Sequence, residues 1–132
     1  MSEPIFYLDR STVRQGALEE VSRRIEELVE FIREQEPQLI AYDFYLDEQG
    51  KHMTVMSVHP DCDSLRLHME VGRSAFQKFA DLIDLFSIEV YGRPSDEVLS
   101  LLEDKAAMLG EGGRVEVHER HAGFLRTQVH TS

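Results

Sequence analysis

The chain has 132 residues, of which 25 are acidic and 14 are basic, so its formal net charge is −11. This length is close to the commonest size of a single domain, and we expect one compact core. The carboxylates are spread over the whole sequence, which argues against nucleic acid or a membrane surface as a partner, because such partners are bound by clustered Lys and Arg. Cys62 is the only cysteine, so no disulfide framework is expected, and charged residues near the N-terminus interrupt any signal-peptide pattern. We therefore expect a cytoplasmic protein.

The first half of the chain predicts a strand, a helix and a β-hairpin. Ile5 to Thr12 begins aromatic and apolar, as strands do. A helix is expected after Gly16 and before Pro37, because apolar residues recur there at helical spacing. Leu39 to Asp47 and Lys51 to His59 alternate in polarity and are joined by a turn, which is typical of a hairpin.

Both faces of this hairpin carry apolar side chains, so something must cover both. One set is expected to face the helices: Ile40, Tyr42, Phe44 and Leu46. The other set is expected on the opposite face of the sheet: Leu39, Ala41, Met53 and Val55. A second subunit stacked on that face would bury the second set, and we therefore expect a homodimer.

The second half of the chain predicts two helices and two strands. Asp and Ser residues begin a helix at Ser64, with a break expected at Gly72 before a further helical segment over Ser74 to Leu82. The tail after Arg126 is expected to be loose. The remaining elements are expected as a strand over Phe86–Tyr91, a helix over Ser95–Leu109 and a strand over Arg114–His121.

The order of these elements is β-α-β-β-α-β with an appended α-β. This order predicts an α+β, ferredoxin-like fold, in which helices pack on one face of an antiparallel sheet. Residues 1–92 form the ferredoxin-like unit. Residues 93–132 form a helix-strand extension of the same domain.

His68 is the strongest candidate for chemistry in the sequence. It lies in the apolar stripe of its predicted helix, with Leu65, Met69 and Phe76, so its imidazole should point into the interior. An imidazole with a pKa near ~6.5 can take a phenolic proton at neutral pH. A structural histidine, bonded to a backbone carbonyl or a Tyr hydroxyl, remains the alternative.

A metal site is not expected from the sequence. His59 and Cys62 are three residues apart, but together they supply only half of a structural zinc site. The neighbouring Asp61 and Asp63 are better explained as helix caps. We predict neither a metal nor another cofactor.

Several short motifs, in their order, resemble the antibiotic-biosynthesis-monooxygenase-like family of dimeric α/β barrels. They are Gln35-Glu36-Pro37, Ala41-Tyr42-Asp43-Phe44, Asp63-Ser64 followed by His68, and Ile88-Glu89-Val90-Tyr91-Gly92. The resemblance covers about Phe6 to Gly92, and Pro94-Ser95 with His121-Ala122-Gly123-Phe124 is similar to an extension seen in one branch of the family. It implies oxygenation of phenols, quinols or anthrones without metal or flavin, in a pocket between helices and sheet.

The resemblance is incomplete, because the chain contains neither Trp nor Asn and some family sites use both. His68 and Tyr42 match positions where the family often has those residue types. The function expected is a cofactor-independent monooxygenase of a small electron-rich aromatic, with His68 catalytic and Tyr42, Phe44 and Phe76 around the substrate. The alternative is a non-catalytic dimeric domain that binds a small hydrophobic ligand or serves only in assembly.

Overall fold

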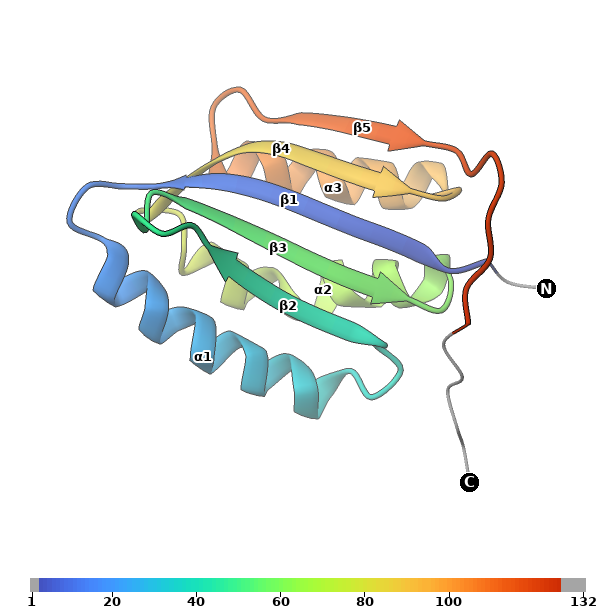
Figure 1. Cartoon of the computed structure of the whole chain (residues 1–132), viewed down its shortest axis with the longest axis horizontal. Helices are drawn as coiled ribbons and strands as arrows, with labels where there is room; N and C mark the ends of the chain where they lie inside the picture. Colours follow the sequence, from blue (N-terminus) through green and yellow to red (C-terminus); the bar gives the residue numbers. More distant parts are fainter. Residues whose placement is uncertain (1–2, 127–132) are drawn as a thin grey trace.

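The computed structural model describes residues 3–126 as one sheet covered by three helices (Figure 1). The elements in chain order are β1 (Ile5–Val13), α1 (Leu18–Gln35), β2 (Ala41–Leu46), β3 (His52–His59), α2 (Cys62–Gln77), β4 (Ile83–Tyr91), α3 (Asp96–Leu109) and β5 (Arg114–His118). The tail expected after Arg126 lies outside the described residues. Within those residues, no helix is both long enough and apolar enough to cross a bilayer.

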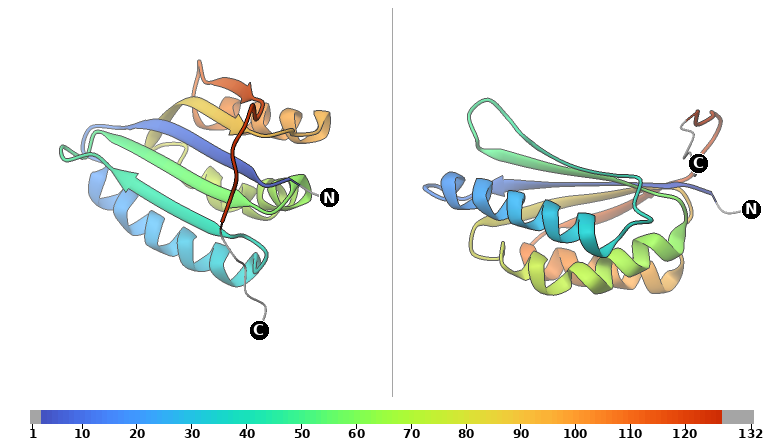
Figure 2. Two further views of the ribbon diagram at one scale, coloured as in Figure 1. Left: turned by 45° about the vertical axis from the view of Figure 1, so that its right-hand side comes forward. Right: turned by 90° about the horizontal axis from the view of Figure 1, so that it is seen from below.

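The sheet has the strand order β2-β3-β1-β4-β5. Neighbouring strands are antiparallel except β4 and β5, which are parallel and connected through α3. All three helices lie on one face of the sheet (Figure 2). The first six elements form the expected ferredoxin-like unit, and α3 with β5 extends its sheet by one strand, so the predicted α+β fold is confirmed.

The expected helix break at Gly72 is wrong, because α2 runs without interruption from Cys62 to Gln77. A Cβ atom at Gly72 would lie 2.3 Å from the ring of Phe76. This glycine therefore makes room for a buried aromatic side chain within the helix. The chain turns after α2, so the helical segment expected over Ser74 to Leu82 ends at Gln77, and β4 begins earlier than expected, at Ile83.

Met53 and Val55 face the helices, so their expected position on the opposite face is wrong. In the β2–β3 ladder, Phe44 lies opposite Val55 and Leu46 opposite Met53. Directly opposed residues of antiparallel strands share a face, and a shift of one residue moves a side chain to the other face. Alternation in each strand was visible in the sequence, but the register that relates the two strands was not.

One face of the sheet is covered by no helix (Figure 2), and exposed aromatic side chains lie on it. We call it the open face. Phe6 lies opposite Tyr91 there, and Tyr45 pairs with Thr54. Phe86 lies at an irregularity in the pairing of β1 with β4. Its ring lies near that of His52, with 6.5 Å between the ring centroids. Exposed aromatic rings gathered on one face of a sheet can mark an interaction surface.

Candidate active site

His68 is buried in α2 and paired with a buried carboxylate. Its Nδ1 atom lies 3.0 Å and 2.9 Å from the two carboxylate oxygens of Glu36. Glu36 is the residue that ends α1, and its own backbone N–H still donates to the carbonyl of Ile32. Pro37 follows directly, which directs the chain out of the helix at this point. The partner of His68 is thus a carboxylate, rather than the backbone carbonyl or Tyr hydroxyl considered from the sequence.

The second ring nitrogen of His68, Nε2, has no hydrogen-bond partner among the described residues. Among residues 3–126, no side chain or backbone group hydrogen-bonds to its Nε2 atom, although that atom is buried. Buried polar atoms are nearly always paired, and the exceptions often serve a function. The arrangement orients one ring nitrogen toward Glu36 and leaves the other without a hydrogen-bond partner among the described residues.

Burial shifts both members of this pair toward their neutral forms. It raises the pKa of Glu36 to about 7, against a smaller lowering effect from its hydrogen bond with Gln38. It also lowers the pKa of His68 to about 3, and the positive charge of Lys105 adds to this effect. Once Glu36 is ionised, it accepts a hydrogen bond from the N–H at Nδ1 of His68, which leaves the lone pair of the neutral imidazole on Nε2. In that form of the pair, the Nε2 lone pair can accept a proton.

The structure brings the other three predicted site residues around His68. The rings of Tyr42 and Phe76 lie against the imidazole at centroid distances of 5.1 Å and 5.2 Å. Phe44 packs edge-on against Tyr42 at 5.2 Å. The side chains come from β2 and α2, which pack together around the end of α1. Their roles toward a substrate remain a prediction.

A small cavity of about 20 Å³ lies between the helices and the sheet. Tyr42, Phe44 and Phe76 line it, together with the polar side chains of Asp9 and Lys105. Its volume is sufficient for about one water molecule. His68 lies beside Tyr42 and Phe76 but is not part of the cavity wall.

Sequence reasoning missed a second buried polar group at this cavity. Lys105, from α3, is only 7% exposed. Its Nζ donates to Tyr7 Oη at 2.8 Å and to Asp9 Oδ2 at 3.0 Å. The same ammonium lies 4.2 Å from the centroid of the Phe76 ring. The extension therefore places a cation inside the domain, next to the predicted site.

His59 belongs to the interior, and its two ring nitrogens pair with serine hydroxyls rather than lying against Cys62. Its Nδ1 and Nε2 lie 2.8 Å and 3.0 Å from the hydroxyl oxygens of Ser64 and Ser57. Cys62 instead accepts a hydrogen bond from the backbone N–H of Ser95, with its Sγ 3.3 Å away. Burial lowers the pKa of His59 to about 3, helped by the nearby charge of His68 when that ring is protonated.

This lowered pKa predicts a specific sensitivity to acid. Unfolded His59 takes up a proton near its ordinary pKa of 6.5, whereas the folded form does so only near 3, so its contribution to stability is lost as the pH falls through that range. The slope is about 1.4 kcal/mol per pH unit for one proton. Between pH 4.5 and 6.5 the opposite shifts of Glu36 and His68 cancel, so they do not mask it.

The measurement is the free energy of unfolding in urea at several pH values for the wild type and His59→Gln. The difference between the two proteins should shrink as the pH falls from 6.5 toward 4.5. A difference that does not change with pH would show that His59 has the same pKa in the folded and the unfolded protein.

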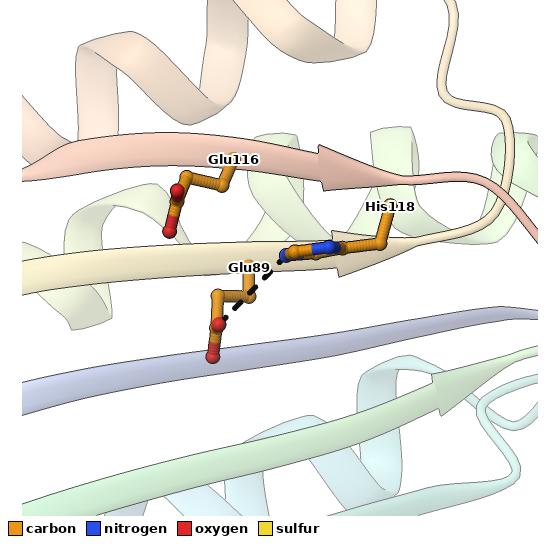
Figure 3. Close-up of side chains that lie close together, drawn as sticks. All are labelled: Glu89, Glu116 and His118. Carbon is orange, nitrogen blue, oxygen red and sulfur yellow. Dashed lines mark ion pairs between the residues drawn. The ribbon is translucent and has the colours of Figure 1, made fainter.

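A separate cluster on the open face has ligand types suited to a divalent metal (Figure 3). The ligand atoms of Glu89, Glu116 and His118 all lie within 4.8 Å of one another. Arg10 already forms an ion pair with Glu89, which partly neutralises the cluster. The cluster lies on the other face of the sheet from the His68 site, so we assign it no part in that chemistry.

No family model matches the sequence, and no curated protein matches it. Several solved structures nevertheless have a similar fold. MupZ from Pseudomonas fluorescens is 18% identical with a TM-score of 0.73, and the match covers 94% of this chain and 95% of that one. It therefore extends over the ferredoxin-like unit and most of the extension.

Other matches are confined to a smaller part of the chain. SnoaB, a cofactor-independent oxygenase from Streptomyces nogalater, is 13% identical with a TM-score of 0.60, and the match covers 71% of this chain and 96% of that one. An antibiotic biosynthesis monooxygenase is 22% identical with a TM-score of 0.59, covering 69% of this chain and 99% of that one. The resemblance read from the sequence is thus confirmed at the level of the fold.

Proposed function

We propose that this chain, whose fold is that of antibiotic biosynthesis monooxygenases, is a cofactor-independent monooxygenase of a small phenol, quinol or anthrone. The observation that carries this proposal is the buried Glu36–His68 pair, with Nδ1 held by the carboxylate and Nε2 without a partner. A carboxylate that orients an imidazole and stabilises its protonated form is a recurrent device for general-base catalysis. His68 is the catalytic residue in this proposal, and Glu36 positions it.

The proposed reaction begins with proton transfer from the substrate hydroxyl to His68 Nε2. The resulting phenolate is a better electron donor than the phenol. A phenol with a free para C–H then reacts with one dioxygen to give a quinone and one water molecule. The substrate supplies all four electrons and the two hydrogens that leave in water, so no external reductant is needed.

Entry of an aromatic substrate requires the cavity to widen. At about 20 Å³ it accommodates a molecule the size of water or dioxygen, and a ring can enter only if Tyr42, Phe44 or Phe76 turns aside. Tyr42 and Phe44 lie on β2, one of the two edge strands of the sheet, and both are only partly buried. The small volume is also the observation that favours the alternative function, a non-catalytic domain.

Oxygen uptake tests the proposal directly. Metal-free protein is assayed with a panel of quinols, phenols and anthrones, alongside His68→Gln and the matched control His52→Gln, whose imidazole is exposed and pairs with Asp47. The wild type and the control should consume oxygen, and His68→Gln should be slower by about 10²–10⁴-fold. Folded wild-type protein that consumes no oxygen with any substrate class would overturn the enzymatic proposal and favour the alternative.

We also propose that the protein is a homodimer that buries its open face. This face, rather than the one with Met53 and Val55, carries the exposed rings of Phe6, Phe86 and Tyr91. Phe86→Asp places a charge there and should convert the dimer to a folded monomer, whereas Glu27→Lys on the solvated side of α1 should not. Sedimentation of the wild type as a monomer at micromolar concentration would contradict the proposal.

A further inference from the structure

We infer that Lys105, supported by Asp9, forms a binding site for an ionised substrate hydroxyl, a phenolate or enolate oxygen. This inference rests on the proposed function and narrows its substrate class to compounds with an acidic hydroxyl. It also gives the C-terminal extension a part in the site, because α3 carries Lys105.

The ammonium of Lys105 has one donor to spare. An ammonium carries three N–H donors, and the structure pairs Nζ with two oxygens, Tyr7 Oη and Asp9 Oδ2. Lys105 and Asp9 both line the cavity. A third hydrogen bond from Nζ can therefore be made to a ligand that enters the cavity.

The two hydrogen bonds also make the lysine a fixed charge. Asp9 is 2% exposed and Lys105 is 7% exposed, so both are held away from bulk water. Charge interactions are stronger there than at the surface, and a charge that is already oriented needs no reorganisation when an anion forms. The Asp9 carboxylate lines the same cavity, and burial together with its charge raises the pKa of the Tyr7 and Tyr42 hydroxyls. The stabilisation of a bound anion therefore has to come from the remaining N–H of Lys105.

One aromatic ring links the lysine to the proposed base. The Phe76 ring lies 4.2 Å from Lys105 Nζ and 5.2 Å, between centroids, from the His68 ring. The absence of a side chain at Gly72 allows the ring to occupy this position. A ligand ring that displaces Phe76 would lie beside both the cation and the base.

Proton transfer between such a ligand and His68 then has a consistent charge balance. The ligand oxygen loses its proton to Nε2 and becomes an anion beside Lys105, while Glu36 stabilises the protonated imidazole. Lys105 thereby favours ionisation of the ligand without exchanging a proton itself. A bound phenol should consequently have a lower pKa than the same phenol in water.

Equilibrium binding of 4-nitrophenol tests this inference without any oxygen chemistry, because its phenol and phenolate forms absorb at different wavelengths. Bound to the wild type, it should ionise at a pH about one unit below that of the free compound, a tenfold change in the equilibrium. 4-Nitroanisole, which cannot ionise, is the matched ligand and should bind the wild type more weakly at a pH where nitrophenol is ionised.

The variant is the double substitution Asp9→Asn with Lys105→Met, which removes both buried charges together and leaves neither unpaired. It should bind the two ligands equally and lose the pKa shift of nitrophenol, while its circular dichroism and urea midpoint show that it remains folded. If that double variant does not fold, two measurements on the wild type still test the inference. They are the preference for nitrophenol over nitroanisole and the dependence of that preference on salt concentration.

The possible outcomes separate this inference from the enzymatic proposal. An ionisation shift in wild-type protein that consumes no oxygen supports the anion site and contradicts the monooxygenase. Oxygen uptake with no ionisation shift, an equal shift in the folded double variant, or no binding of nitrophenol overturns the role of Lys105.

Discussion

Glu36→Gln is expected to lower kcat/KM by about 10²–10⁴-fold with little change in stability. The amide has nearly the same volume as the carboxylate, but it lacks the charge that stabilises a protonated imidazole. In the wild type, kcat/KM should rise with pH through about 7, because the base form requires Glu36 to be ionised and burial raises its pKa to about that value. Stopped-flow or oxygen-electrode measurements between pH 5 and 9 provide the profile.

Gln38→Ala is the matched control, because Gln38 hydrogen-bonds to the same carboxylate and is not the proposed base. Its loss removes an effect that lowers the pKa of Glu36, so the profile should move to slightly higher pH with nearly full activity at the plateau. A Glu36→Gln enzyme with wild-type rates and an unchanged pH profile would show that the pair is structural.

Val55→Asp is expected to unfold the protein. Val55 is 5% exposed, lies opposite Phe44 and faces the helices across the cavity. An unpaired carboxylate buried at this position should cost about 4 kcal/mol or more, which is a large fraction of the roughly 5–15 kcal/mol that stabilises an ordinary domain. Urea unfolding followed by circular dichroism measures the loss.

Thr54→Asp is the control for this prediction, because Thr54 is the neighbouring residue of the same strand and points to the open face. The Thr54→Asp chain should remain folded on its own, including where the added charge weakens the association of two subunits. Equal stability of the two variants would mean that the register of β3 differs from that described.

The fold was predictable from the sequence because its elements have strong local signals. Apolar residues recur at helical spacing in α1 and alternate in β2 and β3, and the order of the elements defines the topology. The side of the sheet to which Val55 points was not predictable, since it depends on a register set by pairing between strands. The break expected at Gly72 failed for a related reason, because the role of that glycine is to accommodate Phe76.

The candidate site was predicted in part. His68 was identified as a polar residue in an apolar helical stripe, and the same criterion applies to Lys105, which lies between Leu102 and Leu109 on the buried side of α3. Asp9 likewise lies two residues from the buried Tyr7 in β1, on the same buried face of the strand. Glu36 carried no such signal, because a carboxylate at the end of a charged helix is typically solvated; only tertiary packing reveals that it is buried against His68.

The extension also changes which strand forms the edge of the sheet that is exposed to other chains. Without it, the nine-residue strand β4 would end the sheet with unpaired N–H and C=O groups, a template for strand-by-strand aggregation. Instead, Gly110 passes so close that a Cβ there would lie 2.1 Å from the carbonyl oxygen of Leu85, and β5 pairs with Ser87 to Tyr91. The new outer strand has five residues, three of them Arg114, Glu116 and His118, so the end of the sheet is short and polar. Further growth of the sheet by added strands is thereby disfavoured on this side.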